Sequence, residues 1–211
     1  MASTGIGQRF PKPAITLIIA QGLAFYSVFF NMILGDSFKF KNILSIALYI
    51  FFAITILARK RKVGMLISTI CLALFTLSNS NASGDFLGTL YSLHTAISML
   101  CLVEIALANL GTPIFEKLLG VARVVFKICF FVNLSTLVLG FLTNLGFLVD
   151  SLDYDFEYAI FYVFNFVISI LITVAMYKIG LWMADIQYTK PVRQNAYIFD
   201  EEPSYFKRNF R

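Results

Sequence analysis

The stretch FLGTLYSLHTAISMLCLVEIALAN, residues 86–109, decides the fold of this chain. It is long and apolar enough to cross a bilayer, which takes about 20 predominantly apolar residues in a helix. It nevertheless contains the only histidine of the chain, His94, and an acidic residue, Glu104. Either group is costly in hydrocarbon unless it faces a partner, a cavity or water. The stretch therefore predicts a membrane helix with other helices beside it.

One face of this helix is marked by polar and small residues. Tyr91, His94, Ser98 and Cys101 follow one another at spacings that return to the same side of a helix, and we expect that side to look into a bundle. The preferred interpretation is a packing seam in which His94 bonds to a neighbouring helix. The alternative is a proton-handling or ligand-binding position, which a titratable imidazole would suit.

The composition of the whole chain is typical of a membrane protein. Of its 211 residues, 59% are hydrophobic and 14% are charged, whereas roughly a quarter of the residues of a soluble domain are charged. Membrane spans take up nearly all of this length and leave no room for a soluble catalytic module. Cys71, Cys101 and Cys129 fall inside the expected spans without a metal-ligand spacing. We therefore expect neither a disulfide framework nor a metal site.

Hydrophobic runs predict an all-α, polytopic membrane helix bundle with six transmembrane helices. The runs cover about residues 14–34, 43–58, 64–78, 86–109, 127–149 and 158–184. A polar segment, residues 1–13, precedes this transmembrane domain (14–184), and a polar tail, residues 185–211, follows it. The third run is short for a span, at about 22 Å. Residues 114–126 carry several charges, and we expect them to lie at the membrane interface as an amphipathic entry to the fifth span.

Basic residues gather on one side of these spans. They are Arg9 and Lys12 before the first span, residues 59–62 after the second, Lys117, Arg123 and Lys127 before the fifth, and five more in the tail. The opposite side has only Lys39 and Lys41. Because cytosolic loops carry the excess of Lys and Arg, we expect both termini in the cytosol. The net charge of +5 thus reports topology rather than a nucleic-acid partner.

Two further spans carry a polar and small stripe. The residues are Cys129, Asn133, Thr136, Gly140 and Asn144 in the fifth span, and Tyr162, Asn165, Ser169 and Thr173 in the sixth. Their spacing places each set on one helix face. Together with the face of residues 86–109, these stripes predict a packed bundle with a mildly polar interior.

Glu104 and Lys178 stand at a similar distance from the cytosolic ends of the fourth and sixth spans, so we expect them to face one another. Arg123 and Lys127 are the competing bases. As structure, the pair is a salt bridge that neutralises two costly charges; as function, it is a gate or coupling site. The structural interpretation is preferred, because no chain of further acids forms a path for protons or cations.

No motif of an enzyme occurs in the sequence. GxSxG, HExxH, a Walker loop and a dinucleotide fingerprint are all absent, and a single histidine does not build a multi-histidine metal site. His94 and Glu104 are separated by about 15 Å along the helix axis and do not form a dyad within it. We therefore expect no catalytic residue, cofactor or metal.

The first functional hypothesis is a non-enzymatic subunit or accessory, scaffolding component of a larger membrane complex. Its partners would be other membrane-protein subunits or further copies of the chain, with the lipid bilayer as surroundings and no nucleic acid. The alternative is a small transporter or channel that uses the polar interior, and an intramembrane enzyme comes third. The candidate interior polar or ligand positions are Tyr91, His94, Ser98, Glu104, Asn133, Asn165 and Lys178. We expect a multi-pass protein of a eukaryotic endomembrane or plasma membrane.

Overall fold

The computed structural model describes residues 12–33, 40–58, 62–79, 86–111, 113–154 and 156–188, which form helices and no strand. The helices are α1 (Lys12–Ile33), α2 (Phe40–Leu57), α3 (Lys62–Asn79), α4 (Phe86–Ala108), α5 (Pro113–Thr143), α6 (Leu145–Tyr154) and α7 (Phe156–Tyr188). Residues 59–61 of the basic run and most of both polar ends lie outside the described residues. The expected all-α fold class is confirmed for the part that is described.

Among the described residues, five helices are long and apolar enough to cross a membrane. Their apolar parts are Lys12–Phe29, Phe40–Leu57, Phe86–Ala108, Ile114–Thr143 and Ala159–Asp185. The apolar part of α3, Lys62–Ser78, is shorter, as the sequence predicted for the third run. A chain with five such helices has the composition and helix lengths of an integral membrane protein.

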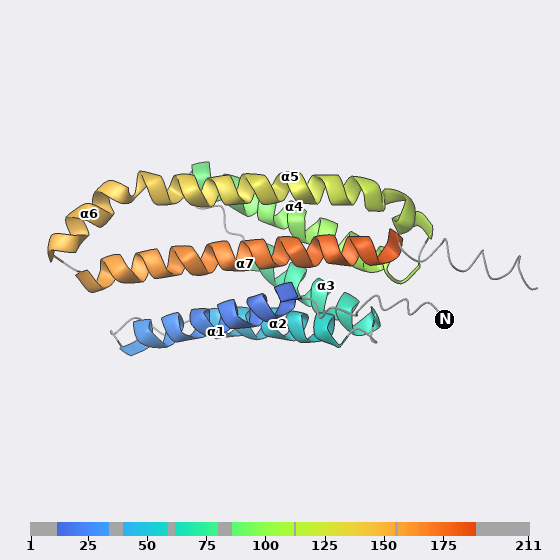
Figure 1. The fold of residues 1–211 in the computed structure, drawn as a ribbon, viewed down its shortest axis with the longest axis horizontal. Helices are drawn as coiled ribbons and strands as arrows, with labels where there is room; N and C mark the ends of the chain where they lie inside the picture. The colour runs from blue at the N-terminus through green and yellow to red at the C-terminus, as the bar shows by residue number, and fades with distance from the viewer. Residues whose placement is uncertain are drawn as a thin grey trace, which may run out of the picture.

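The six longer helices form a ring in chain order. Each of α1 to α5 packs against the next, and α7 closes the ring by packing against both α5 and α1. Helices α4 and α7 also touch each other directly. Figure 1 shows these helices along a common axis, with α4, α5 and α7 on one side and α1, α2 and α3 on the other. The short α6 bends away from the end of α5 toward the start of α7.

Helix α5 begins and ends earlier than the expected fifth span. It runs without a break from Pro113 to Thr143, about 47 Å at 1.5 Å per residue, so residues 114–126 are part of the long helix and not a separate segment. Its end at Thr143, rather than Val149, follows from Asn144. The side-chain amide of Asn144 donates to Gly140 O over 2.7 Å, and its backbone N–H bonds to Phe141 O in a tighter turn. Helix α6 begins at the next residue.

Helices α4, α5 and α7 approach closely at Gly180. A Cβ atom placed there would overlap the ring of Phe126 on α5 and would lie 3.0 Å from Leu102 Cδ1 on α4. The fully buried Ile179 and Met183 continue this contact along α7. Side chains therefore fill the space where α4, α5 and α7 meet at Gly180.

Candidate ligand cavity between α4, α5 and α7

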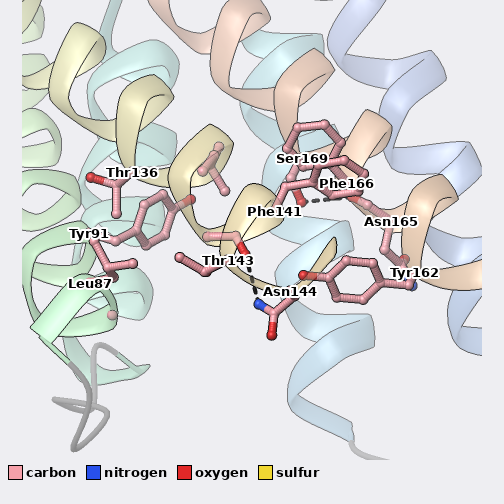
Figure 2. A pocket seen from close by; sticks show the side chains of 13 residues that line it. Leu87, Tyr91, Thr136, Phe141, Thr143, Asn144, Tyr162, Asn165, Phe166 and Ser169 are labelled. Atoms are coloured by element: carbon pink, nitrogen blue, oxygen red, sulfur yellow. Dashed lines mark hydrogen bonds between the residues drawn. The ribbon is translucent and has the colours of Figure 1, made fainter. Parts of the chain in front are cut away.

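A cavity of about 360 Å³ lies between α4, α5 and α7, and we call it the outer cavity. It is near the end of the bundle where α4 and α7 begin and α5 ends, as Figure 2 shows. Its polar lining comes from all three helices and consists of Tyr91, Thr136, Thr143, Asn144, Tyr162, Asn165 and Ser169. The described residues that line the cavity include none with a charge. The volume lies within the range of about 300–1,000 Å³ that is typical of small-molecule sites.

Stacked aromatic rings form one wall of the outer cavity. The ring of Phe141 on α5 stacks on that of Phe166 on α7, with centroids 4.1 Å apart and planes 16° apart. It also lies nearly parallel to the ring of Tyr162, at 5.9 Å. Figure 2 shows Tyr91 across the pocket from these rings. Flat apolar surface of this kind suits a ligand with a flat apolar body.

The hydroxyl groups of Thr136 and Ser169 in the lining donate hydrogen bonds to backbone carbonyl groups of their own helices. Thr136 Oγ1 donates to Val132 O over 2.8 Å, and Ser169 Oγ donates to Asn165 O over 2.9 Å. A hydroxyl has one proton and two lone pairs, so each oxygen keeps acceptor capacity after this bond. The polar wall of the outer cavity thus offers acceptors at Thr136 and Ser169, beside the tyrosine hydroxyls and asparagine amides that can also donate.

A second, smaller cavity of about 70 Å³ lies next to the outer cavity, and we call it the inner chamber. Its polar lining is Tyr49, Tyr91, Thr95, Ser98, Asn133, Thr173 and Tyr177. The side chain of Asn133 is only 7% exposed, and its Oδ1 atom is buried without a hydrogen-bond partner. Tyr91 lines both cavities. This small space has room for a few water molecules or for one polar group of a ligand.

Four of the seven candidate positions meet at these cavities. Tyr91, Ser98 and Asn133 line the inner chamber, and Tyr91 and Asn165 line the outer cavity. The Oδ1 atom of Asn165 also accepts a hydrogen bond of 2.7 Å from Ser27 Oγ on α1. This bond ties α7 to α1 beside the cavity. The sequence analysis did not single out Ser27; its position one residue after Tyr26 in an apolar run was the only signal.

His94 lies outside both linings. Its Nδ1 atom is 2.8 Å from Leu90 O, one turn earlier on the same helix. Because a carbonyl oxygen only accepts, Nδ1 carries the proton of this bond. The hydrogen bond that the structure gives to the half-buried His94 is therefore within α4, and not the bond to a neighbouring helix that the preferred interpretation expected.

The predicted pairing of Glu104 with Lys178 is wrong. Leu102 on α4 and Gly180 on α7 are in contact, so the two charges do lie at similar depth. Each is two residues from its contact residue, which turns it by about 200° around its helix and away from the facing helix. Lys178 is exposed and Glu104 is half-buried. The ion pair that is seen near this end joins Arg123 on α5 to Asp185 on α7 over 2.6 Å.

Asn109 forms a polar link between α4 and α7, which Glu104 and Lys178 do not form. It is 3% exposed, and its side-chain amide donates to Ile105 O and to Met183 O, each at 3.0 Å. The sequence analysis placed Asn109 at the end of the fourth span without giving it a role. An amide at the last turn of an apolar helix was the available signal.

No family model, no curated protein and no solved structure matches this chain. Within the described part of the chain, no group of three or more His, Cys, Asp and Glu side chains is placed to hold a metal ion. The candidate site therefore rests on its own geometry: an uncharged cavity with polar groups and an aromatic wall, and a small chamber beside it.

Proposed function

We propose that this chain is a non-enzymatic, multi-pass membrane protein that binds a small uncharged molecule in the outer cavity. The observation that carries the proposal is the convergence of polar stripes from three helices on one cavity of about 360 Å³. Polar side chains inside apolar helices are costly, and they are usually kept for helix contacts or for function. Around this cavity they border open space, where helix contact alone does not account for them.

The role that we favour for this binding is that of a small transporter. The outer cavity lies where α4 and α7 begin, whereas at Gly180, further along α7, the three helices pack closely against one another. The ion pair between Arg123 and Asp185 joins α5 to α7 beyond that packed region. A cavity on one side of a packed region is expected for one state of a carrier with alternating access, and not for an open channel.

The binding proposal is tested with a defined probe, 2-(naphthalen-2-yl)ethanol, and the purified full chain in lipid nanodiscs. Equilibrium dialysis against empty nanodiscs measures saturable binding. Gly140 lines the outer cavity and Gly22 lies exposed on α1, and a Cβ atom at either position meets nothing within 4 Å. Gly140→Phe should fill the cavity and abolish saturable binding, whereas the matched control Gly22→Phe should keep it. No saturable binding to the wild type, or equal binding to both variants, refutes the proposal.

We also propose that six helices span the membrane with both termini in the cytosol, in a eukaryotic endomembrane or plasma membrane. The segregation of Lys and Arg supports this topology. In a background without native cysteines, Ser204→Cys in the tail and Asp153→Cys near the start of α7 should react with an impermeant thiol reagent from opposite sides of the membrane. Labelling of both from the same side would rule the topology out.

A second proposed role is that of an accessory subunit of a larger membrane complex. Lys178 favours it, because this charge is exposed within the apolar part of α7. A charge on such a surface either reaches toward the headgroups or pairs with an acid of a partner subunit. Affinity purification in mild detergent tests whether Lys178 pairs with a partner subunit. A co-purifying subunit should be lost with Lys178→Leu and kept with Val163→Leu, which changes another exposed residue of α7; equal recovery with both refutes the contact.

A further inference from the structure

The inner chamber contains one acceptor that has no hydrogen-bond partner in the described structure, the buried Oδ1 atom of Asn133. Thr95, in the same lining, has the hydroxyl of Tyr91 within reach of its own hydroxyl. The hydroxyl of Thr173, which lines the same chamber, donates its proton to Ser169 O over 2.8 Å. The carbonyl oxygen of an amide only accepts, so Asn133 Oδ1 requires an N–H or O–H donor. Buried polar groups without a partner are rare in folded proteins and call for a missing donor.

The inner chamber adjoins the outer cavity at Tyr91. This side chain belongs to the lining of both spaces, and it projects from α4 opposite the aromatic wall in Figure 2. Asn133 is one helical turn from Thr136 of the outer cavity along α5, and Thr173 is one turn from Ser169 along α7. A molecule in the outer cavity is therefore adjacent to the acceptors of the chamber.

We propose that the inner chamber is the recognition subsite of the ligand cavity, and that Asn133 Oδ1 accepts a hydrogen bond from a donor group of the ligand. The inference rests on the proposed binding function and names its ligand class. The ligand is an uncharged molecule with a flat apolar body, which lies against Phe141 and Phe166, and a terminal hydroxyl or N–H group, which extends past Tyr91. An ammonium group is disfavoured, because no acid is among the described lining residues of either cavity.

A pair of probes that differ only in the donor tests the subsite. These are 2-(naphthalen-2-yl)ethanol and 2-ethylnaphthalene, measured by equilibrium dialysis with the full chain in nanodiscs and with empty nanodiscs as the blank. One hydrogen bond to a buried acceptor is worth about a tenfold difference in dissociation constant, so the wild type should bind the alcohol about tenfold more tightly. Asn133→Leu, of similar size, should abolish this preference. Ser169→Ala, in the outer cavity, should keep it.

A second measurement covers the case in which a variant alters the fold. Asn133→Leu replaces an oxygen that has no hydrogen-bond partner by an apolar group of similar shape, so the empty protein should unfold at the same temperature or higher. A lower unfolding temperature for this variant, together with an unchanged preference for the alcohol, would mean that the chamber only holds structural water and would overturn the inference.

The outcomes separate the two proposals. If neither probe binds saturably to the wild type, the proposed binding function fails, and the inference fails with it. If both probes bind with equal affinity, or if Asn133→Leu keeps the tenfold preference, the proposal of binding in the outer cavity is retained and the recognition subsite is refuted. Loss of the preference in Asn133→Leu but not in Ser169→Ala supports the subsite.

Discussion

Adding one methyl group at Gly180 should destabilise the bundle, although alanine is the better helix former. A Cβ atom at Gly180 would overlap the Cε1 and Cζ atoms of Phe126. The ring has little freedom to move, because it is 5% exposed and stacks beside Tyr177 with centroids 6.2 Å apart. Overpacking of this kind costs about 1–3 kcal/mol. With the middle of that range, about 2 kcal/mol, and a gain in helix propensity of about 0.5–1 kcal/mol, Gly180→Ala should cost about 1–1.5 kcal/mol.

Gly22→Ala is the matched control for this prediction. The same substitution in the interior of α1 places a Cβ atom with nothing within 4 Å, so only the helix-propensity gain of about 0.5–1 kcal/mol applies. The two variants should therefore differ by about 2 kcal/mol with opposite signs. The measurement is the free energy of unfolding of the purified protein in mixed micelles with increasing SDS, followed by far-UV circular dichroism.

A double-mutant cycle identifies the Phe126 ring as the cause. Leucine has no atoms in place of Phe126 Cε1 and Cζ, so Gly180→Ala should cost nothing in a Phe126→Leu background. The coupling free energy should then be about 1–1.5 kcal/mol. If Gly180→Ala is as stable as the wild type, or costs the same with and without the ring, the close packing of α4, α5 and α7 at this position is refuted.

Three further predictions concern polar residues on α4 and α7. Asn109→Leu should lower the free energy of unfolding by about 1 kcal/mol in the same assay, because the bond to Met183 O is lost, and an unchanged value would contradict that link. Glu104→Gln and Lys178→Met should have additive effects within about 0.5 kcal/mol, and a larger coupling would restore the ion pair that the structure lacks. His94→Gln should bind the naphthyl alcohol like the wild type at pH 5.5 and pH 7.5, because the imidazole lies outside both cavities; a variant-specific loss of pH dependence would argue against that placement.

The sequence predicted the helices and their polar faces well, because both depend on local periodicity. The polar stripes of α4, α5 and α7 were visible as spacings of three and four residues, and most of their members line one of the two cavities. A stripe marks the side of a helix that faces inward regardless of which helix it meets. Hence Tyr91, Asn133 and Asn165 could be selected without knowledge of the packing.

Contacts between helices were harder to predict, because depth alone does not fix the direction of a side chain. Glu104 and Lys178 were placed at the correct relative depth, but a shift of two residues around a helix turns a side chain by about 200°. Helix directions were set by apolar contacts such as that of Leu102 with Gly180. Single charged residues show no periodicity in the sequence that would reveal these contacts. The direction in which a charged side chain points is therefore a result of how the apolar faces of the helices pack.

Two glycines show that the position of the cavity also depends on packing that the sequence does not reveal. Gly140 and Gly180 are both interior glycines of long apolar helices, and the sequence does not distinguish between them. At Gly180 the missing side chain is replaced by the ring of Phe126, and the three helices close. At Gly140 the position of the missing Cβ atom meets nothing within 4 Å, and the residue borders the outer cavity. Just beyond it, the break at Asn144 ends α5 and turns the chain into α6. The outer cavity therefore borders a glycine whose missing side chain is not replaced by a neighbour, whereas at Gly180 the ring of Phe126 takes that place.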